Sequence, residues 1–369
     1  MKNLSDKITF VVFVVFIFTA LAINLILPQR SYSESEKRAL TTFSASALKD
    51  SSPSDALECA AKDQFFLRDN LRELKSAFER HFISISRSGD FAVKDDNIIR
   101  LYYPYDTERI ANAKEYISTV CKRYLDGCDN LYISIIPSKS ELADLPSLSS
   151  KSTLEYLKNA DDRLALIDIY SSLSIESYYL TDIHWRCENI LPTANLINRA
   201  MKSMITEKNE LRPVKAGDFV GSLSYQASLK SAPEEVNLLS SDTIDSLKVI
   251  YKNGIGELYD ISDENTSSDF YNIFMKGEVL DKSLGNNIII IKNENAKAER
   301  RLIIFRDSFT RSIAPLLMKG YSEAVLIDVR TPSALLSKGS AKEILDNIDT
   351  DCDILFLLSM DMLLTTDLK

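Results

Sequence analysis

The sequence predicts an α/β protein with a mostly parallel sheet covered by helices, preceded by one N-terminal transmembrane helix. Three features indicate this architecture: an uncharged apolar stretch near the N-terminus, later apolar runs rich in β-branched residues, and amphipathic stretches between those runs. Strands that alternate with helices are joined by crossover connections, which favour a parallel sheet. Ligands bind such sheets at the carboxyl ends of the strands, so functional residues are expected just after predicted strands.

The N-terminal stretch has the length and composition of a single membrane span. Residues 8–27 carry no charge over 20 positions, which is about the number that a helix needs to cross the hydrocarbon core. Lys2 and Lys7 precede this stretch, Pro28 stops it, and no small-x-small cleavage motif follows, so an uncleaved anchor is favoured over a removed signal peptide. The positive-inside rule then places residues 31–369 outside the cytoplasm.

The composition argues against several classes of protein. The net charge of −9 and the pI near 5.1 exclude nucleic acid as an expected partner, because no basic stripe is present to neutralise phosphates. The 10 glycines form no glycine-rich phosphate loop. With two histidines and five separated cysteines, the chain shows no pattern of metal ligands, and neither a metal nor another cofactor is expected. Isolated buried thiols are favoured over a disulfide bridge between Cys121 and Cys128.

The region after the membrane span changes from polar to helical. Residues 29–52 are polar and serine-rich, which is typical of a stem. Pro53 begins a helical stretch, and apolar residues within 66–82 recur at spacings of three and four, which defines one helix face. His81 falls beside that face and is interpreted as a structural histidine. The predicted parts of the chain are a cytoplasmic tip with the membrane anchor (1–28), the polar stem with a helical region (29–89) and the main domain (90–369).

The main domain carries repeated strand and helix signals. Residues 110–124 form an amphipathic helix, and residues 131–136 form a short apolar run that Pro137 ends, as expected of a buried strand. Further strands are predicted at 164–169, 288–291, 302–305, 324–327 and 354–358, with further helices at 191–204, 313–318 and 341–348.

One of the two histidines lies in a segment that suits hydrolytic or acyl-transfer chemistry. Asp182 comes two residues before His184, and residues i and i+2 of an extended segment project to the same side, so the carboxylate can reach the imidazole N–H. Serine hydrolases and acyltransferases need a hydroxyl, an imidazole that takes its proton, and a carboxylate that orients the imidazole. The alternative is a loop histidine that hydrogen-bonds Asp182 and rests on Trp185.

A serine in a suitable place follows the strand predicted at 302–305. Ser308 is expected at the carboxyl edge of the sheet, before a helix that begins near Thr310 and whose N-terminal amides can face a developing oxyanion. The alternative is that Asp307 and Ser308 only cap this helix. The Asp-x-His segment and this serine in one chain together favour the catalytic interpretation.

Two motifs and several shorter segments resemble a known family. The motifs are Thr181-Asp182-x-His184-Trp185 and the later Arg306-Asp307-Ser308-Phe309. They resemble the DHHW family, membrane-anchored relatives of the alginate O-acetyltransferases (AlgX and AlgJ type) in the SGNH hydrolase superfamily. The resemblance covers nearly the whole chain. It includes Ile136-Pro137-Ser138-Lys139, Phe219-Val220-Gly221-Ser222-Leu223 and a strand that ends in Ile327-Asp328-x-Arg330.

The resemblance implies a flavodoxin-like domain of the SGNH-hydrolase type in which Ser308 is the nucleophile, His184 is the base and Asp182 orients the base. Acetyl groups would pass through an acyl-serine to or from a hydroxyl of an exported or cell-envelope polysaccharide. The protein would then be a membrane-anchored O-acetyltransferase or acetylesterase, with a membrane-bound O-acyltransferase as the partner that supplies acetyl. The alternative is a non-catalytic glycan-binding or assembly component that retains the fold.

The chain departs from the family pattern at two positions. Ile183 replaces the second histidine, and on an extended segment it points away from its neighbours, so the triad need not be affected. Arg306 stands where the stricter pattern has glycine. Its guanidinium either reaches the site, where it would crowd the nucleophile or bind an anionic glycan, or faces away and pairs with a neighbouring acid.

Further residues are candidate oxyanion or substrate contacts. Gly221 and the Ser308 N–H are the candidate oxyanion donors. Lys139 lies just beyond a strand end, where it either reaches the edge of the site or is a solvated surface lysine. Arg330 ends a strand on the same edge, with pairing to Asp328 or to a helix terminus as the alternative. Trp185 is either a core residue or an aromatic wall for a pyranose ring.

Overall fold

The computed structural model describes residues 4–33, 38–43, 53–82, 87–88, 90–251, 254–257, 288–330, 348 and 352–368. The chain divides into two compact units, which are treated separately below. The first unit comprises Met1–Gly89 and Ser222–Ser231, and the second comprises Asp90–Gly221 and Ala232–Lys369. The inclusion of Ser222–Ser231 in the first unit was not anticipated from the sequence, because this segment is far from residues 1–89 along the chain.

The first unit contains the long apolar helix. Helix α1 spans Leu4–Ile26, and by length and composition it is the one helix in the described part of the chain that is able to cross a membrane. His81 lies in α4, but its side chain is outside those described. The apolar face predicted for α4 is exposed, since Leu71, Leu74 and Phe78 are 47%, 66% and 51% accessible. The other elements of this unit are β1 (Tyr32–Ser33), β2 (Arg38–Ala39), α3 (Pro53–Gln64), α4 (Arg68–Phe82), β3 (Arg87–Ser88) and α9 (Ser222–Gln226).

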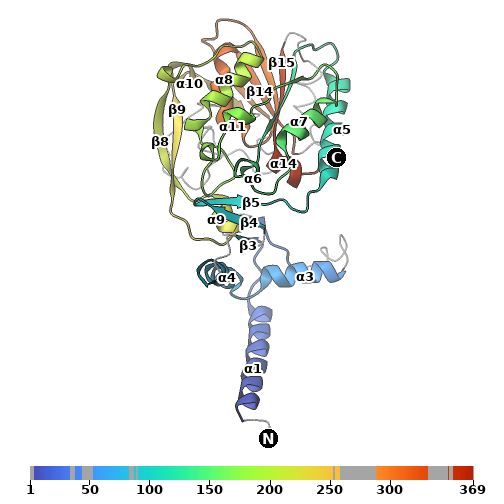
Figure 1. Cartoon of the computed structure of the whole chain (residues 1–369), viewed down its shortest axis with the longest axis vertical. Helices are drawn as coiled ribbons and strands as arrows, with labels where there is room; N and C mark the ends of the chain where they lie inside the picture. Colours follow the sequence, from blue (N-terminus) through green and yellow to red (C-terminus); the bar gives the residue numbers. More distant parts are fainter. Residues whose placement is uncertain are drawn as a thin grey trace. The chain divides into compact units, whose positions relative to one another are not determined.

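The second unit is built around a mixed, mostly parallel sheet (Figure 1). Eight strands follow the order β11-β10-β12-β14-β13-β15-β6-β7, and the five from β14 to β7 run parallel to one another. The predicted α/β class is therefore confirmed. The strands are β6 (Leu131–Ile136), β7 (Ala165–Leu166), β10 (Lys248–Tyr251), β11 (Gly254–Glu257), β12 (Ile288–Lys292), β13 (Arg301–Arg306), β14 (Glu323–Asp328) and β15 (Asp353–Ser359).

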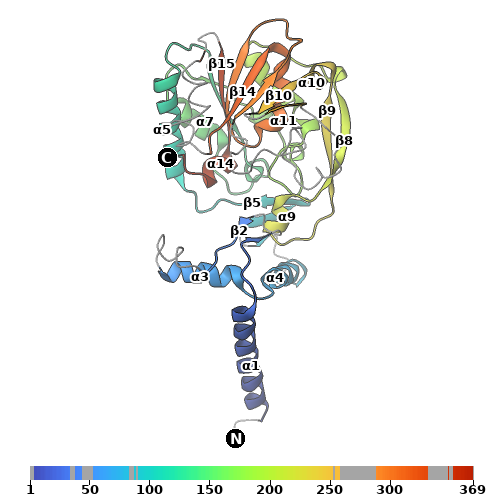
Figure 2. The same ribbon diagram turned by 180° about the vertical axis from the view of Figure 1, so that it is seen from behind.

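Helices cover both faces of this sheet (Figures 1 and 2). Along β13, Leu302 and Ile304 pack into the core with α8 and α11, whereas Ile303 and Phe305 pack into the core with α5, α7 and α14. Successive side chains of a strand point to opposite faces, so a strand buried on both sides reads as a continuous apolar run. The helices are α5 (Thr107–Tyr124), α7 (Ser150–Lys158), α8 (Leu191–Ala200), α11 (Thr310–Leu317) and α14 (Met360–Thr365).

Several elements differ from the sequence prediction. Strand β12 pairs antiparallel with β14, and β10 and β11 extend the sheet from it in antiparallel fashion, so one edge departs from the parallel pattern. The strand predicted at 164–169 is limited to the two residues of β7. The helix predicted at 341–348 lies, apart from Ile348, outside the described residues. The smaller elements are β4 (Phe91–Lys94), β5 (Asn97–Arg100), α6 (Lys139–Leu142), β8 (Arg212–Phe219), β9 (Glu234–Ser240) and α10 (Asp242–Asp245).

The cysteines agree with the prediction of separate thiols. No disulfide joins Cys121 to Cys128, and both side chains are buried, as are those of Cys187 and Cys352. Burial raises the pKa of the Cys121 thiol to about 12, so this group is un-ionised at neutral pH.

Candidate active site

Ser308 occupies the turn between β13 and α11 at the carboxyl edge of the parallel strands. The side chain of Asp307 holds this turn, since Oδ1 accepts a hydrogen bond from the Phe309 N–H at 3.0 Å and Oδ2 accepts one from the Ser359 N–H at 2.7 Å. These bonds tie the turn to the end of the neighbouring strand β15. Asp307 is buried, whereas Ser308 is partly exposed. Of the two residues named in the capping alternative, Asp307 binds the backbone at the start of α11, whereas the Ser308 hydroxyl hydrogen-bonds His184.

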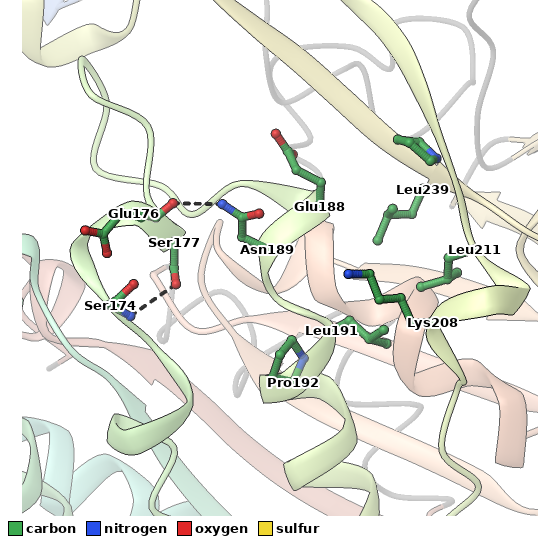
Figure 3. A pocket seen from close by; sticks show the side chains of 11 residues that line it. Ser174, Glu176, Ser177, Glu188, Asn189, Leu191, Pro192, Lys208, Leu211 and Leu239 are labelled. Carbon is green, nitrogen blue, oxygen red and sulfur yellow. Dashed lines mark hydrogen bonds between the residues drawn. The ribbon is translucent and has the colours of Figure 1, made fainter.

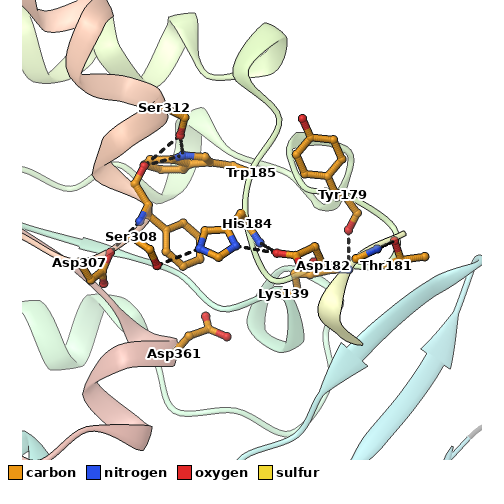
Figure 4. A network of polar contacts seen from close by, with 12 residues as sticks. Lys139, Tyr179, Thr181, Asp182, His184, Trp185, Asp307, Ser308, Ser312 and Asp361 are labelled. Carbon is orange, nitrogen blue, oxygen red and sulfur yellow. Dashed lines mark hydrogen bonds and ion pairs between the residues drawn. The ribbon is translucent and has the colours of Figure 1, made fainter. Parts of the chain in front are cut away.

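Ser308, His184 and Asp182 form a continuous chain of hydrogen bonds (Figure 4). The Ser308 hydroxyl lies 2.9 Å from His184 Nε2, and His184 Nδ1 lies 2.6 Å from Asp182 Oδ1. Asp182 Oδ1 also accepts the backbone N–H of His184 at 3.1 Å, which fixes the carboxylate beside the ring. With Nδ1–H donating to the carboxylate, Nε2 is the acceptor for the serine proton. This arrangement is able to activate a hydroxyl for attack.

A buried carboxylate that the sequence analysis did not identify fixes the loop before His184. Glu234, at the start of β9, accepts the Leu180 N–H at 2.7 Å and the Thr181 N–H at 2.8 Å. It also accepts the Thr181 hydroxyl and forms a 2.6 Å ion pair with Arg186. Both oxygens of this carboxylate therefore accept hydrogen bonds from the loop. These bonds hold the two ends of the Asp-x-His loop in place.

Lys139 lies beneath the same loop and is neither a surface lysine nor a group at the open edge of the site. Its side chain is 3% exposed, and Nζ donates to the carbonyl oxygens of Ile98, Tyr179 and Leu180 at 2.9, 2.7 and 3.0 Å. A fourth bond, at 3.3 Å, reaches the carbonyl of Asp182. Burial lowers the pKa of Lys139 to about 8, although nearby carboxylates oppose the shift. Lys139 therefore stabilises the loop from the protein interior, because its ammonium group donates its hydrogen bonds to backbone carbonyls.

Trp185 is a core residue that links the His184 loop to the serine turn. It is fully buried, and its indole N–H donates to the Phe309 carbonyl at 3.1 Å and to Ser312 Oγ at 2.6 Å (Figure 4). The Phe309 ring packs between the two segments, with its centroid 4.5 Å from the His184 ring and 5.6 Å from the indole. The role of a wall for a sugar ring is thus excluded by burial, and Trp185 instead fixes the His184 loop relative to the turn that carries Ser308.

The two arginines at the strand ends bind Asp328 rather than the open site. Arg306 is completely buried, with Nη1 3.1 Å from Asp328 Oδ2 and 3.3 Å from the Asp307 carbonyl. Arg330 reaches the same carboxylate at 2.9 and 2.6 Å. Burial opposes ionisation of Asp328, but Arg330 and Arg306 hold its pKa below the ordinary value. Of the two possibilities raised for Arg306, pairing with an acid is the one found, and its second bond braces the turn that carries Ser308.

Gly221 is needed for close packing against the Asp-x-His loop. Its N–H donates to Thr181 Oγ1 at 2.8 Å, so this group is already used and does not bind an oxyanion. A Cβ at this position would overlap the Thr181 carbonyl and the Asp182 side chain. Only glycine fits such a close approach. The Ser308 N–H remains the candidate oxyanion donor.

Two more residues near the site were missed by sequence reasoning. Asp361 is buried in α14, directly after β15, and accepts a hydrogen bond from the Tyr102 hydroxyl. Its position just beyond a predicted strand, at 354–358, is a signal that could have identified it. Tyr102 and Glu234 carried no such signal, because their proximity to the site depends on tertiary packing.

A pocket of about 480 Å³ is lined by segments that precede and follow the His184 loop along the chain and by the β8 and β9 region (Figure 3). Asp182, His184 and Ser308 are not among its lining residues. The lining residues are Ser174, Glu176, Ser177, Glu188, Asn189, Leu191, Pro192, Lys208, Leu211, Pro213 and Leu239.

Comparison with known proteins finds relatives by structure. No protein-family model matches the sequence, and no curated protein matches it either. The crystal structure of a DHHW family protein from Eubacterium siraeum has a TM-score of 0.59 at 18% identity and covers 75% of this chain and 92% of that chain. Bacillus cereus PatB1 with a sulfonyl adduct has a TM-score of 0.55 at 18% identity, with 76% and 97% covered. The O-acetyltransferase domain of Pseudomonas putida AlgJ is a more distant match, with a TM-score of 0.43 at 10% identity and 75% and 93% covered.

At 18% sequence identity, the structural similarity to these two proteins shows a shared fold. Over about three quarters of its length, the chain has the fold of the DHHW family protein and of PatB1, so the resemblance inferred from the motifs is confirmed at the level of the fold.

Proposed function

We propose that this protein is a membrane-anchored serine O-acetyltransferase or acetylesterase of the SGNH type that acts on an exported or cell-envelope polysaccharide. The observation that carries the proposal is the hydrogen-bonded series Ser308, His184 and Asp182 at the carboxyl edge of the sheet. A buried base held by a carboxylate and in contact with a partly exposed hydroxyl is the arrangement that acyl transfer through serine requires.

The proposed reaction has two steps. Ser308 Oγ attacks the carbonyl carbon of an acetyl ester while His184 Nε2 takes the hydroxyl proton, and the Ser308 N–H faces the oxygen that becomes negative. The protonated ring then gives its proton to the departing alcohol, which leaves acetyl bound to Ser308. In the second step His184 takes a proton from a sugar hydroxyl or from water, whose oxygen attacks the acetyl carbon. The bond between the acetyl group and Ser308 Oγ then breaks, and the protonated ring returns its proton to Ser308 Oγ.

The motif resemblance supports the polysaccharide assignment, and a structural neighbour supports the nucleophile. The PatB1 structure carries a sulfonyl adduct. Sulfonyl reagents add to activated serine hydroxyls, so an adduct on a protein of the same fold agrees with a serine nucleophile in this chain. The apolar helix α1 agrees with a membrane anchor, and we place the second unit outside the cytoplasm.

The competing proposal of a non-catalytic component drew its support from Arg306. The structure weakens that support, because the guanidinium is completely buried and pairs with Asp328. The same observation removes the reason to expect a preference for anionic glycans.

The proposal is tested by ester turnover with the full chain in detergent. An activated aryl acetate serves as the donor, with and without a panel of neutral and acidic oligosaccharides as acceptors. We expect release of the aryl alcohol and acetylation of at least one oligosaccharide, both lost in Ser308→Ala and retained in Ser152→Ala, which changes an exposed serine on α7. Equal turnover by wild type and Ser308→Ala would contradict the proposal.

A further inference from the structure

Asp361 has a buried carboxyl group in which only one of the two oxygens accepts a hydrogen bond within the described part of the chain. The residue is 6% exposed, and its Oδ1 accepts a hydrogen bond from the Tyr102 hydroxyl. Oδ2 is buried and makes no hydrogen bond within the described part of the chain. Figure 4 shows the carboxyl group on the side of the network where Ser308 and His184 meet, turned toward the imidazole. A buried acceptor without a donor is unfavourable for stability, so such a group is commonly kept for function.

The charged and titratable groups around Asp361 come from several elements. Those that interact with it are Arg100 at the end of β5, Tyr102 just after β5, His184 in the Asp-x-His loop, Asp307 in the serine turn, Lys139 in α6 and Tyr178. Burial raises the pKa of Asp361 to about 6, while Tyr102 and the His184 charge act in the opposite direction. Burial also raises the pKa of the Tyr102 hydroxyl well above its usual value, so it remains a donor at any working pH.

We propose that Asp361, held by Tyr102, is a second carboxylate that stabilises the protonated His184 ring formed during acyl transfer. This inference rests on the proposed function and adds a positioning residue to it. Asp182 fixes the orientation of the ring through Nδ1, whereas Asp361 acts through space from the side of Ser308. As the proton moves from Ser308 to Nε2, the ring becomes cationic, and a buried negative charge close to it lowers the energy of that state.

Two substitutions separate this role from a structural one. Asp361→Asn keeps the shape and the Tyr102 contact but removes the charge. The value of kcat/KM for the aryl acetate should therefore fall about tenfold above pH 7, where the wild-type carboxyl group is ionised, and the difference from wild type should narrow as the pH falls toward 5. Tyr102→Phe keeps the carboxyl group but removes the bond that favours its ionised form. Its activity should therefore be low near pH 6.5 and return to the wild-type level near pH 8.5. Two substitutions serve as controls. Tyr103→Phe changes the exposed tyrosine next to Tyr102, and Asp367→Asn changes an exposed acid just after α14, the helix that carries Asp361.

A direct measurement keeps the inference testable even if the ester assay fails. The chain has two histidines, so the signals of labelled imidazole rings in the detergent-solubilised full chain are assigned by comparison with His81→Gln. The NMR titration curve of His184 should move about one pH unit lower in Asp361→Asn, because the protonated ring loses a neighbouring negative charge. An unmoved curve, or Tyr102→Phe activity that stays low at pH 8.5, would overturn the inference. Loss of the proposed function alone would instead appear as unchanged turnover in Ser308→Ala, with the shift in the titration curve retained.

Discussion

Asp182, His184 and Ser308 carry unequal parts of the proposed chemistry. Ser308→Ala removes the nucleophile, so kcat should fall by about 10⁴-fold or more, whereas Asp182→Asn removes only the orientation of the base and should leave about 10 to 100 times more activity than Ser308→Ala. Both variants should keep the wild-type unfolding temperature within a few degrees. The check is the ratio of the two kcat values at saturating ester, and an Asp182→Asn enzyme less active than Ser308→Ala would invert the assigned roles.

Asp361 should make stability depend on pH in a defined window. Its pKa is about 6 in the folded protein and near the ordinary 3.8 when unfolded, so the folded state holds the proton more tightly. Stability therefore falls as the pH rises from about 4 to 6. Asp361→Asn removes this loss and should be more stable than wild type at pH 7, by about 3 kcal/mol, with little difference at pH 4. Tm measured for both proteins at the two pH values checks this, and parallel pH dependences would contradict it.

The position of His184 depends on a short loop that three buried groups hold from different sides. Glu234 binds the backbone N–H groups that precede Asp182, Lys139 binds the carbonyls, and Trp185 connects the loop to the serine turn. These bonds come from β9, α6 and the loop itself, so the Asp-x-His geometry is a property of several elements rather than of the motif alone. Misplacing a catalytic group by about 1 Å is enough to lower a rate strongly.

Glu234→Gln tests the loop directly. A glutamine presents one acceptor oxygen, so its NH₂ group must face donors that the carboxylate now satisfies. We expect a loss of stability of about 2 kcal/mol, together with a fall in kcat, because the Leu180 and Thr181 amides lose a partner. Glu235→Gln is the matched control, since the adjacent side chain is exposed and pairs with Lys215 at the surface. Comparable effects of the two substitutions would show that the buried carboxylate has no special role.

The parallel strands were predictable, because a strand that is buried on both faces consists of consecutive apolar residues. The runs predicted at 302–305, 324–327 and 354–358 differ from β13, β14 and β15 by one residue at each end. Strand β8 was missed, because it is half exposed and contains Pro213 and a bulge at Gly217, which leave no clear alternation. The direction of β12 also could not be predicted, since pairing depends on which strand the chain meets in space.

The site residues of a rare type, such as histidine, were predictable from the sequence. The environments of common residues, such as arginine and lysine, were not. With two histidines in 369 residues, His184 stood out, and Ser308 followed from its place after a strand. Arg306 was left open between two environments, because its sequence neighbours do not show that Asp328 lies within 3.1 Å. Lys139 was left open between the edge of the site and the solvated surface, and only the packed structure shows that carbonyls from distant segments converge on its Nζ.

The orientation of the whole chain is a prediction from α1 and the lysines before it. A protease added outside intact cells should remove the residues after about position 31 and leave the N-terminal tip attached to the membrane. Two tags, one at each terminus, report the two parts, and a cytoplasmic protein in the same cells shows that the membrane is intact. Protection of the C-terminal tag would reverse the orientation and place the site on the cytoplasmic side.

The central claim is that His184 makes Ser308 a nucleophile that carries the acyl group. The most direct measurement is the intact mass of the full chain after brief incubation with an activated acetyl ester, and separately with a sulfonyl fluoride, followed by peptide mapping. We predict one added acetyl or sulfonyl group, located on Ser308, with the sulfonyl adduct persisting and both adducts absent from Ser308→Ala and His184→Ala. An adduct on another residue, or equal labelling of His184→Ala and wild type, would contradict the account.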